Sequence, residues 1–332
     1  MLKNLPVKTG CLILAMIFLQ GCAIVILPSL KPRKSPLEEV VLEEPRGWFT
    51  RDKVLLLDIS GVLTAGKTGG IFGSSHNTVD ELKEALRKAE SDPRIRAVVL
   101  RIDTPGGGVT ASDIIYREIR EFRERTGKPV IAQMMGMAAS GGVYISMAAD
   151  RIYAHPTTLT GNIGVISVFP RLEGLAGKIG MDVRVIKSGD KKDIGSMWRD
   201  FTPEERRILQ SVIDEYYGKF LEVVLESRGN AGSSRLREIA DGRVLTAWQA
   251  LEAGLIDGVC YLPESIEKAK EESGISDSVV VTYKRRHEYR ENIYSLHGSE
   301  APSARTQIGL FNVDAGGVSM DTTPRFMYLW AP

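Results

Sequence analysis

Cysteine and histidine are scarce in this chain, which has three cysteines and four histidines among 332 residues. No two cysteines form a C-x-x-C pair, and two of the three lie in the N-terminal apolar segment, so no disulfide framework can be read. No H-E-x-x-H or comparable spacing predicts a metal site. We therefore expect neither a metal nor a cofactor.

A strong charge of one sign is also missing. Lysine and arginine total 43 against 42 aspartates and glutamates, which leaves a net charge of +1. A nucleic-acid-binding domain usually presents a basic patch, so nucleic acid is not an expected partner. The content of 43% apolar and 26% charged residues is typical of a globular protein.

The N-terminus carries an apolar run over residues 11–27, behind Lys3 and Lys8. A basic flank followed by an apolar core is typical of an export signal. Leu19–Cys22 resembles a bacterial lipobox, in which the signal is cut before Cys22 and its thiol is lipidated, although its glutamine is unusual there. The alternative is an uncleaved anchor, for which about 17 residues is at the short limit. We favour the lipobox, and either version puts the body at a membrane, outside the cytoplasm of a bacterium.

Composition divides the chain into four segments. Residues 1–27 are the signal or anchor, and residues 28–52, with four prolines and mixed charges, are expected to form a tether. Residues 53–285 form the folded domain, and residues 286–332 form a weakly patterned tail. The tail ends in the apolar segment Arg325–Trp330, which predicts a strand or a docking segment.

Apolar strands alternate with amphipathic helices through the folded domain. This alternation is typical of βαβ units and predicts an α/β fold with a buried, mostly parallel sheet. The expected strands are 54–59, 97–102, 130–134, 152–154, 164–168 and 183–187. Capping motifs at Thr78, Thr202 and Thr246 predict the starts of three helices, and an apolar face from Ala111 to Phe122 predicts another.

Ser140 lies in a turn that follows a strand and opens a helix. Its neighbours Ala138, Ala139, Gly141 and Gly142 are small enough for a substrate backbone to come close. The free N–H groups at a helix N-terminus favour a developing oxyanion. A plain N-cap serine is the alternative interpretation.

A second turn, Gly106–Gly108, also follows a strand and precedes a helix. Parallel strands place such turns along one edge of a sheet. The two turns can therefore supply a nucleophile and the second backbone donor of an oxyanion hole, although the glycines could serve only a positive-φ loop. The spacing from Gly106 to Ala111 nominally fits a dinucleotide fingerprint, but no acidic residue ends the next strand, and we reject that interpretation.

A serine nucleophile needs a base, and histidine is the usual one. The histidines lie in a loop, at a strand end or in the tail, which gives little support for a Ser–His–Asp triad; they are His76, His155, His287 and His297.

A lysine base is the remaining candidate, and Lys191 and Lys192 lie in a loop after an expected strand. Such a lysine must be neutral, which requires a pKa several units below about 10.4. Asp190 and Asp193 would keep it charged unless they point away. From the local sequence alone, a solvated surface lysine is the simpler interpretation.

Five segments, in order, resemble the signal peptide peptidase A family of serine proteases in its short, single-repeat bacterial form. The resemblance covers about residues 54–270. The segments are Arg101–Gly108, Met137–Tyr144, Thr160–Val165, Lys192–Ser196, and Ala240–Thr246 followed by Gln249-Ala250 and Gly254–Asp257.

This resemblance implies a role for individual residues. Ser140 is the nucleophile, and Lys192, rather than its neighbour Lys191, is the general base. The backbone N–H groups of Gly107 and Gly141 are the oxyanion donors. The family usually has a serine where this chain has Asn162, so we expect the Asn162 amide to orient the lysine.

The resemblance also implies a fold, an assembly and a substrate class. The fold is the Clp protease/crotonase-like βαβ superhelix with a mostly parallel sheet. The assembly is a ring-like homo-oligomer in which the serine and the lysine of one site come from neighbouring subunits. The substrates are cleaved signal peptides and other hydrophobic peptides released from the membrane.

Two rival functions stay open. A crotonase-type acyl-CoA enzyme would use the same fold, but the export signal argues against its cytoplasmic setting. A non-catalytic membrane scaffold on a protease fold would explain the unusual Asn162.

Overall fold

The computed structural model describes residues 35–45, 47, 50–65, 77–229, 233–285, 292–295, 311–314, 317–320 and 326–330. The chain divides into an N-terminal unit, Met1–Pro36, and a folded unit, Leu37–Pro332. The lipidation candidate Cys22 and three of the histidines lie outside the described residues. The part of the chain that is described contains no helix both long and apolar enough to cross a membrane.

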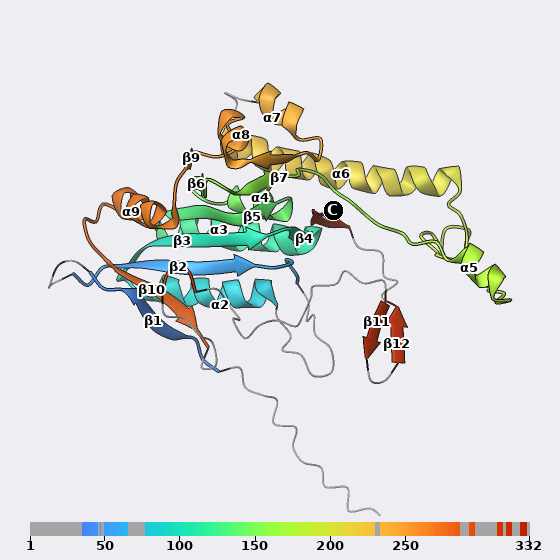
Figure 1. Cartoon of the computed structure of the whole chain (residues 1–332), viewed down its shortest axis with the longest axis horizontal. Coiled ribbons are helices and arrows are strands. Elements are labelled where there is room, and N and C mark those ends of the chain that lie inside the picture. Colours follow the sequence, from blue (N-terminus) through green and yellow to red (C-terminus); the bar gives the residue numbers. More distant parts are fainter. Residues whose placement is uncertain are drawn as a thin grey trace, which may run out of the picture. The chain divides into compact units, whose positions relative to one another are not determined.

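A mostly parallel sheet forms the centre of the folded unit (Figure 1), which confirms the expected α/β fold. Its order is β1-β10-β2-β3-β5-β6-β9, and β7 pairs with both β5 and β8. Only the β1–β10 and β7–β8 ladders among these described pairs are antiparallel. The strands are β1 (Glu38–Glu43), β2 (Lys53–Ser60), β3 (Ile95–Thr104), β5 (Val130–Ala139), β6 (Arg151–Ala154), β7 (Leu159–Gly161), β8 (Val244–Thr246), β9 (Gly258–Val259) and β10 (Val279–Lys284).

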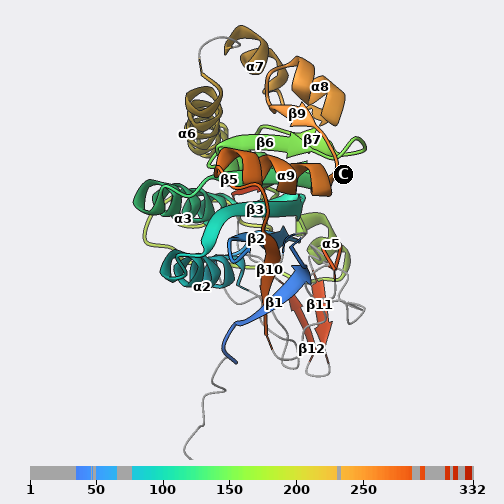
Figure 2. The ribbon, with the colours of Figure 1, turned by 90° about the vertical axis from the view of Figure 1, so that its left-hand side faces the viewer.

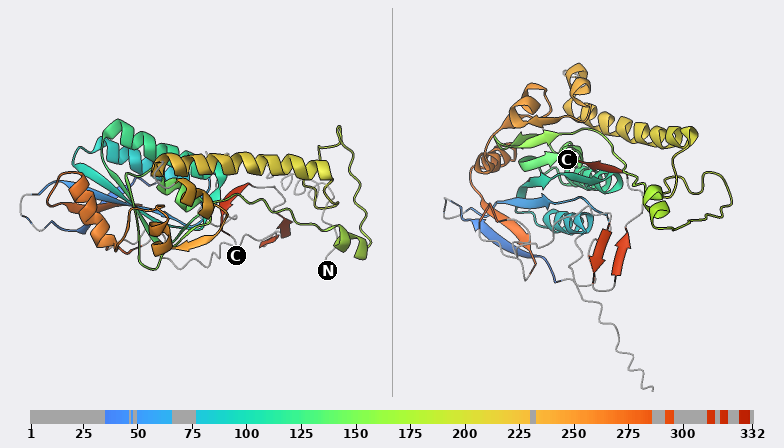
Figure 3. Two further views of the ribbon diagram at one scale, coloured as in Figure 1. Left: turned by 90° about the horizontal axis from the view of Figure 1, so that it is seen from above. Right: turned by 45° about the vertical axis from the view of Figure 1, so that its right-hand side comes forward.

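Helices cover both faces of this sheet (Figures 2 and 3). Alternate residues of a strand point to opposite faces. Leu55 and Leu57 of β2 therefore pack with α2, α3 and α4, whereas Val54 and Leu56 pack with α9. The helices are α2 (Thr78–Ser91), α3 (Val109–Thr126), α4 (Gly141–Ser146), α5 (Glu173–Lys178), α6 (Pro203–Arg228), α7 (Ser233–Ile239), α8 (Ala247–Glu252) and α9 (Leu262–Glu272).

Two small antiparallel pairs complete the described strands. Strand β11 (Phe311–Asp314) pairs with β12 (Gly317–Met320), and β4 (Gly106–Gly108) pairs with β13 (Met327–Leu329). The second pair joins the glycine turn to the apolar segment for which the sequence predicts a strand or docking segment. It brings the last described residues to the edge of the sheet where β3 and β5 end.

The helix caps follow local sequence with one exception. Thr202 and Thr246 each complete a capping box with the residue three positions on, as predicted. The box expected at Thr78 is wrong, because Asn77 is the N-cap of α2 and accepts from the Asp80 N–H at 3.3 Å. An asparagine one residue earlier offers an equally good side-chain acceptor.

Two strand predictions are wrong. Residues 183–187 form no strand, and the Val185 and Ile186 side chains are exposed. An extended segment becomes a strand only when another strand pairs with it, and none of the described residues does so here. Residues 164–168 contribute a single bridge, between Ile166 and Met327, and β7 forms just before them.

The folded unit begins inside the segment expected to be a tether. Strand β1 pairs with β10 along the sheet edge. The amine of Lys53 binds the carboxylates of Glu39 at 2.5 Å and Asp92 at 2.9 Å, which fastens this strand to the start of β2.

Candidate active site

Ser140 lies at a sharp bend between β5 and α4. Its φ of 52° and ψ of −110° are unusual for a residue with a side chain. The bend is fixed from both sides, because the Ser140 N–H donates to the Gly161 carbonyl at 2.8 Å and the Tyr144 N–H donates to the Ser140 carbonyl at 3.0 Å. Such strain persists only where the surrounding structure enforces it, and it clusters at functional sites.

The Ser140 hydroxyl is buried and has no hydrogen-bond partner among the described residues. It does not cap helix α4, so the plain N-cap interpretation is wrong. A buried hydroxyl without a partner costs about 1–3 kcal/mol. The buried hydroxyl of Ser140 therefore lowers the stability of the fold, and a role in folding does not explain it.

The glycines after Ser140 are required by packing. A Cβ on Gly141 would lie 2.6 Å from the Ser112 hydroxyl oxygen, and one on Gly142 would lie 2.9 Å from Thr104 Cγ2. Helix α4 can therefore pack against α3 and the end of β3 only with glycine at both positions. This close packing also brings the first-turn backbone of α4 next to the glycine turn, since a Cβ on Gly106 would lie 2.8 Å from the Gly141 nitrogen.

The glycine turn is paired on both sides. On one side, the Leu63 N–H donates to Gly106 at 2.9 Å and the Gly108 N–H donates to Leu63 at 3.0 Å. On the other side, the antiparallel ladder puts Tyr328 of β13 opposite Gly107. A Cβ on Gly107 would overlap the Leu63 carbonyl oxygen, so no larger residue fits between these neighbours.

The Tyr328 carbonyl lies where the sequence predicts an oxyanion hole. The ladder is bonded on either side, from Trp330 N–H to Pro105 and from Val109 N–H to Phe326. Because bonded pairs alternate along an antiparallel ladder, the Gly107 N–H faces the Tyr328 carbonyl. That oxygen would also overlap a Cβ on Gly106 and lie 3.1 Å from one on Gly141.

The side chain of Tyr328 fills an aromatic pocket beside the bend. It is almost completely buried, stacks on Tyr144 with ring centroids 5.1 Å apart, and lies 4.7 Å from the Phe220 ring. Its hydroxyl donates to the Tyr216 carbonyl at 2.9 Å. The sequence predicted a strand or a docking segment here, and the structure shows a strand paired with the glycine turn. This contact joins residues far apart in sequence, so no local pattern predicts it.

Lys192 makes no hydrogen bond with Ser140 in the single chain. Its side chain is exposed and has no hydrogen bond or ion pair with the described residues, and the Ser140 hydroxyl has no partner there either. Lys191, in contrast, binds Glu204 at 2.5 Å, and this hydrogen bond raises the pKa of Lys191. Of the two lysines, only Lys191 has an ion-pair partner among the described residues, and the role of Lys192 as the general base stays a prediction.

Asn162 has a structural contact. It is the other described residue with a side chain and positive φ, at 52°. Its side-chain nitrogen donates to the Gly242 carbonyl at 2.7 Å, and its backbone N–H donates to Arg243 at 2.7 Å. These bonds fix the loop after β7, and none of them involves Lys192, so the predicted lysine-orienting role is not visible in one chain.

The described histidine and cysteine have structural contacts, and the described residues offer no metal site. His155 contacts the Thr157 hydroxyl and packs edge-on against Tyr261, and it makes no hydrogen bond with the Ser140 hydroxyl. Among the described residues, no group of histidine, cysteine, aspartate and glutamate side chains could hold a metal ion. Cys260 is a buried thiol beside Ser265.

Comparison with known proteins matches two families over the residues of this site. The peptidase family S49 matches residues 122–276, and the Clp protease family matches residues 72–160. The first range contains Ser140, Asn162 and Lys192, and the second contains Gly107, Ser140 and Gly141.

Individual relatives carry protease names. A candidate protease of Synechocystis is 39% identical over 208 residues, which cover 63% of this chain and 70% of the relative. A candidate signal peptide peptidase SppA of Enterococcus faecium is 31% identical over 248 residues, covering 75% and 71%. Protease 4 of Salmonella typhi is 35% identical over 213 residues, covering 64% of this chain but 32% of that longer protein.

Proposed function

The chain belongs to peptidase family S49 and is a serine endopeptidase, and we propose that it cuts peptide bonds with Ser140 as nucleophile and Lys192 as general base. The observation that carries this proposal is a peptide carbonyl, that of Tyr328, lying against the two glycine turns beside a buried hydroxyl without a partner in the described chain. None of the three relatives described above has a name that points to an acyl-CoA enzyme.

The proposed reaction is acyl transfer in two steps. The Ser140 oxygen attacks the substrate carbonyl carbon while a neutral Lys192 amine takes the hydroxyl proton. The N–H groups of Gly107 and Gly141 bind the oxyanion, and loss of one such donor typically costs about 2.7–4 kcal/mol of barrier. The amine product leaves with the proton from Lys192, and a water molecule, deprotonated by the same lysine, then releases the acyl group.

Peptide substrates would bind as an added strand in the position of β13. A strand there pairs with β4 on one side and meets Ile166 on the other, as Met327 does through two 3.0 Å backbone bonds. Main-chain pairing of this kind gives affinity, and side-chain pockets give specificity. The pocket around Tyr144 and Phe220 favours an apolar or aromatic substrate side chain, which fits hydrophobic peptides such as cleaved signal peptides.

We further propose that each site is completed by a second copy of the chain. In the described part of one chain the Ser140 hydroxyl has no partner and Lys192 is exposed. The segment that carries Lys192 also exposes large apolar side chains, including Leu175, Ile179 and Ile186. A homo-oligomer would cover these residues and bring Lys192 of one copy to Ser140 of the next.

The export signal predicted from residues 1–27 supports a place at the extracytoplasmic face of a bacterial membrane. Anchoring would come through a lipid on Cys22 or through the uncut apolar run. Such an anchor would keep the protease close to peptides released from the membrane.

The test uses the full-length protein in detergent and a quenched fluorescent hydrophobic peptide. We expect Ser140→Ala and Lys192→Met to abolish cleavage, and the matched control Lys191→Met to retain it, because Lys191 is paired with Glu204. A fluorophosphonate probe should label Ser140 in the wild type. Full activity of Lys192→Met would refute the dyad, and a probe that fails to label Ser140 in the assembled protein would favour the non-catalytic scaffold.

A further inference from the structure

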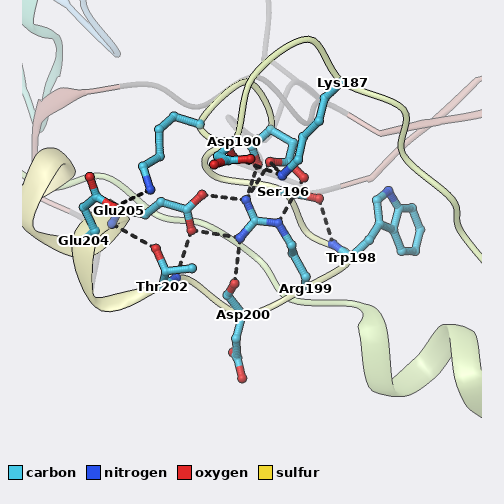
Figure 4. A network of polar contacts seen from close by, with 11 residues as sticks. Lys187, Asp190, Ser196, Trp198, Arg199, Asp200, Thr202, Glu204 and Glu205 are labelled. Carbon is cyan, nitrogen blue, oxygen red and sulfur yellow. Dashed lines mark hydrogen bonds and ion pairs between the residues drawn. The ribbon is translucent and has the colours of Figure 1, made fainter.

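The loop that carries Lys192 is organised around one guanidinium group, that of Arg199 (Figure 4). Its Nε and Nη2 atoms donate to the two carboxylate oxygens of Asp193 at 3.0 and 2.6 Å. Its Nη1 and Nη2 atoms donate to the two carboxylate oxygens of Glu205 at 2.8 and 2.6 Å. Arg199 thus makes two bidentate pairs, a geometry that the point charge of a lysine cannot reproduce.

One of these two carboxylates, that of Glu205, is buried and helps to cap a helix. The Glu205 side chain is 1% exposed and belongs to the capping box at the start of α6, where it accepts from the Thr202 N–H at 2.8 Å. The other carboxylate, that of Asp193, directly follows Lys192 in the chain. Arg199 therefore links the residue next to the proposed base to the capped N-terminus of a helix of 26 residues.

A free carboxylate beside Lys192 would oppose catalysis. An opposite charge within about 4–6 Å favours the charged form of a lysine, which cannot accept a proton. Asp193 is the nearest acidic residue in sequence, and the Arg199 fork and the Lys187 amine, at 2.7 Å, engage both of its oxygens.

The other charged groups of this loop are also accounted for. Glu204 binds Lys191, and Asp200 binds Arg171 at 2.5 Å. Asp190 accepts from Lys187 through its backbone carbonyl, and its side chain is exposed. The hydrogen bonds from Arg199 also hold the pKa of Glu205 at about 2 and keep the pKa of Asp193 well below its ordinary value, so both carboxylates stay charged and paired.

We propose that Arg199 is a positioning residue for the general base: it holds the Asp193 carboxylate toward α6, so that Lys192 can reach Ser140 as a neutral amine. This inference rests on the proposed role of Lys192. The new element is the role of Arg199, which keeps the Asp193 carboxylate away from the Lys192 amine.

The test compares pH profiles of kcat/KM for four versions of the full-length protein. In Arg199→Gln/Glu205→Gln, Asp193 loses its fork, whereas the amide introduced at position 205 still caps α6 and no buried charge is left without a partner. We expect the acidic limb of the profile to move up by about one pH unit, which is about a tenfold loss on that limb. Adding Asp193→Asn to this double variant should return the limb to the wild-type position. The matched control Arg151→Gln removes an exposed ion pair with Glu272 and should leave the profile unchanged.

Each outcome separates the two proposals. A purely structural role for Arg199 would lower kcat/KM at every pH, without moving the limb, and Asp193→Asn would not restore it; that result overturns the positioning role. An unshifted profile with an inactive Lys192→Met variant also refutes the positioning role and leaves the dyad standing. An active Lys192→Met variant refutes both. Melting temperatures of all variants identify those that fail to fold, and for such variants Arg199→Lys with and without Asp193→Asn provides the same comparison.

Discussion

At the scale of single residues, the structure keeps two unfavourable features at Ser140. A positive φ on a residue with a side chain costs about 1–3 kcal/mol, and a buried hydroxyl without a partner in the described chain costs a similar amount. Neither feature improves the packing of α4. Both are expected when a nucleophile must be presented to a substrate rather than used in a hydrogen bond of the fold.

Ser140→Ala should therefore abolish activity and stabilise the protein. Removing the orphan hydroxyl should raise the free energy of unfolding by about 1 kcal/mol, measured by urea denaturation. Ser146→Ala is the matched control on the same helix, because the Ser146 hydroxyl is buried but donates to the Gly142 carbonyl at 2.7 Å. That control should lower stability, and a loss of stability of equal size in both variants would contradict the interpretation of Ser140.

The residues of the site differ in how far the sequence could predict them. A serine between small residues after a strand is a local signal, and Ser140 could be proposed from it. Local sequence favoured a solvated surface lysine at position 192, and Lys192 is indeed exposed in one chain, so its proposed role comes from the family resemblance alone. Arg199 had no signal at all, because its importance lies in two carboxylates brought together by the fold.

At the scale of elements, the start of α6 connects the helix to the loop of Lys192, because Glu205 both caps α6 and binds Arg199. The capping box was predicted from Thr202 and Glu205, whose separation of three residues fixes the geometry locally. Strands were harder to predict, because their existence depends on distant partners. Residues 183–187 have the composition of a strand, but no described strand pairs with them. Strands β1 and β10, in contrast, pair with each other although the rest of the folded domain lies between them in sequence.

The Glu205–Arg199 pair should make stability depend on acid. The hydrogen bond from Arg199 lowers the pKa of Glu205 from 4.5 to about 2, so its contribution is complete above pH 4.5 and is lost as the pH falls toward 2. Below pH 4.5 the unfolded chain binds a proton that the folded chain does not. The Glu205→Gln variant should have a lower free energy of unfolding than the wild type at pH 7. Between pH 4.5 and 3 its free energy of unfolding should fall less steeply than that of the wild type, and the two slopes should differ by up to about 1.4 kcal/mol per pH unit.

The measurement is the urea midpoint as a function of pH. Glu272→Gln is the control, since Glu272 is a partly exposed partner in a surface pair with Arg151. Parallel curves for the wild type and Glu205→Gln would show that Glu205 titrates alike in the folded and unfolded states.

Strand β13 should compete with substrate. Removal of residues 321–332 frees the edge of β4 and the pocket that Tyr328 fills, so we expect kcat/KM for a hydrophobic peptide to rise severalfold. The loss of a buried tyrosine should at the same time lower the melting temperature. A synthetic peptide with the sequence of residues 325–330 should inhibit the truncated enzyme, and a scrambled peptide should not; unchanged activity with no inhibition would contradict this binding mode.

At the scale of the whole molecule, one segment is poorly explained by a single chain. Residues 166–200 leave the sheet and return to α6 (Figure 3), and they carry the proposed base as well as Ile179, Val185 and Ile186 with exposed side chains. Several large apolar side chains exposed along one segment favour an interaction surface there. A second copy of the chain is the partner that would explain the apolar exposure and the unpartnered serine together.

Mixed oligomers give the sharpest test of that arrangement. Ser140→Ala and Lys192→Met chains should each be inactive alone, but an oligomer containing both has some sites with an intact serine from one copy and an intact lysine from its neighbour. With equal, random mixing by co-expression, about a quarter of the sites would be complete, and activity should recover to that level. Mixing either variant with the double variant should restore nothing. If co-expressed single variants form oligomers yet stay inactive, each site is built within one chain, and Lys192 must then reach Ser140 by a rearrangement of its own loop.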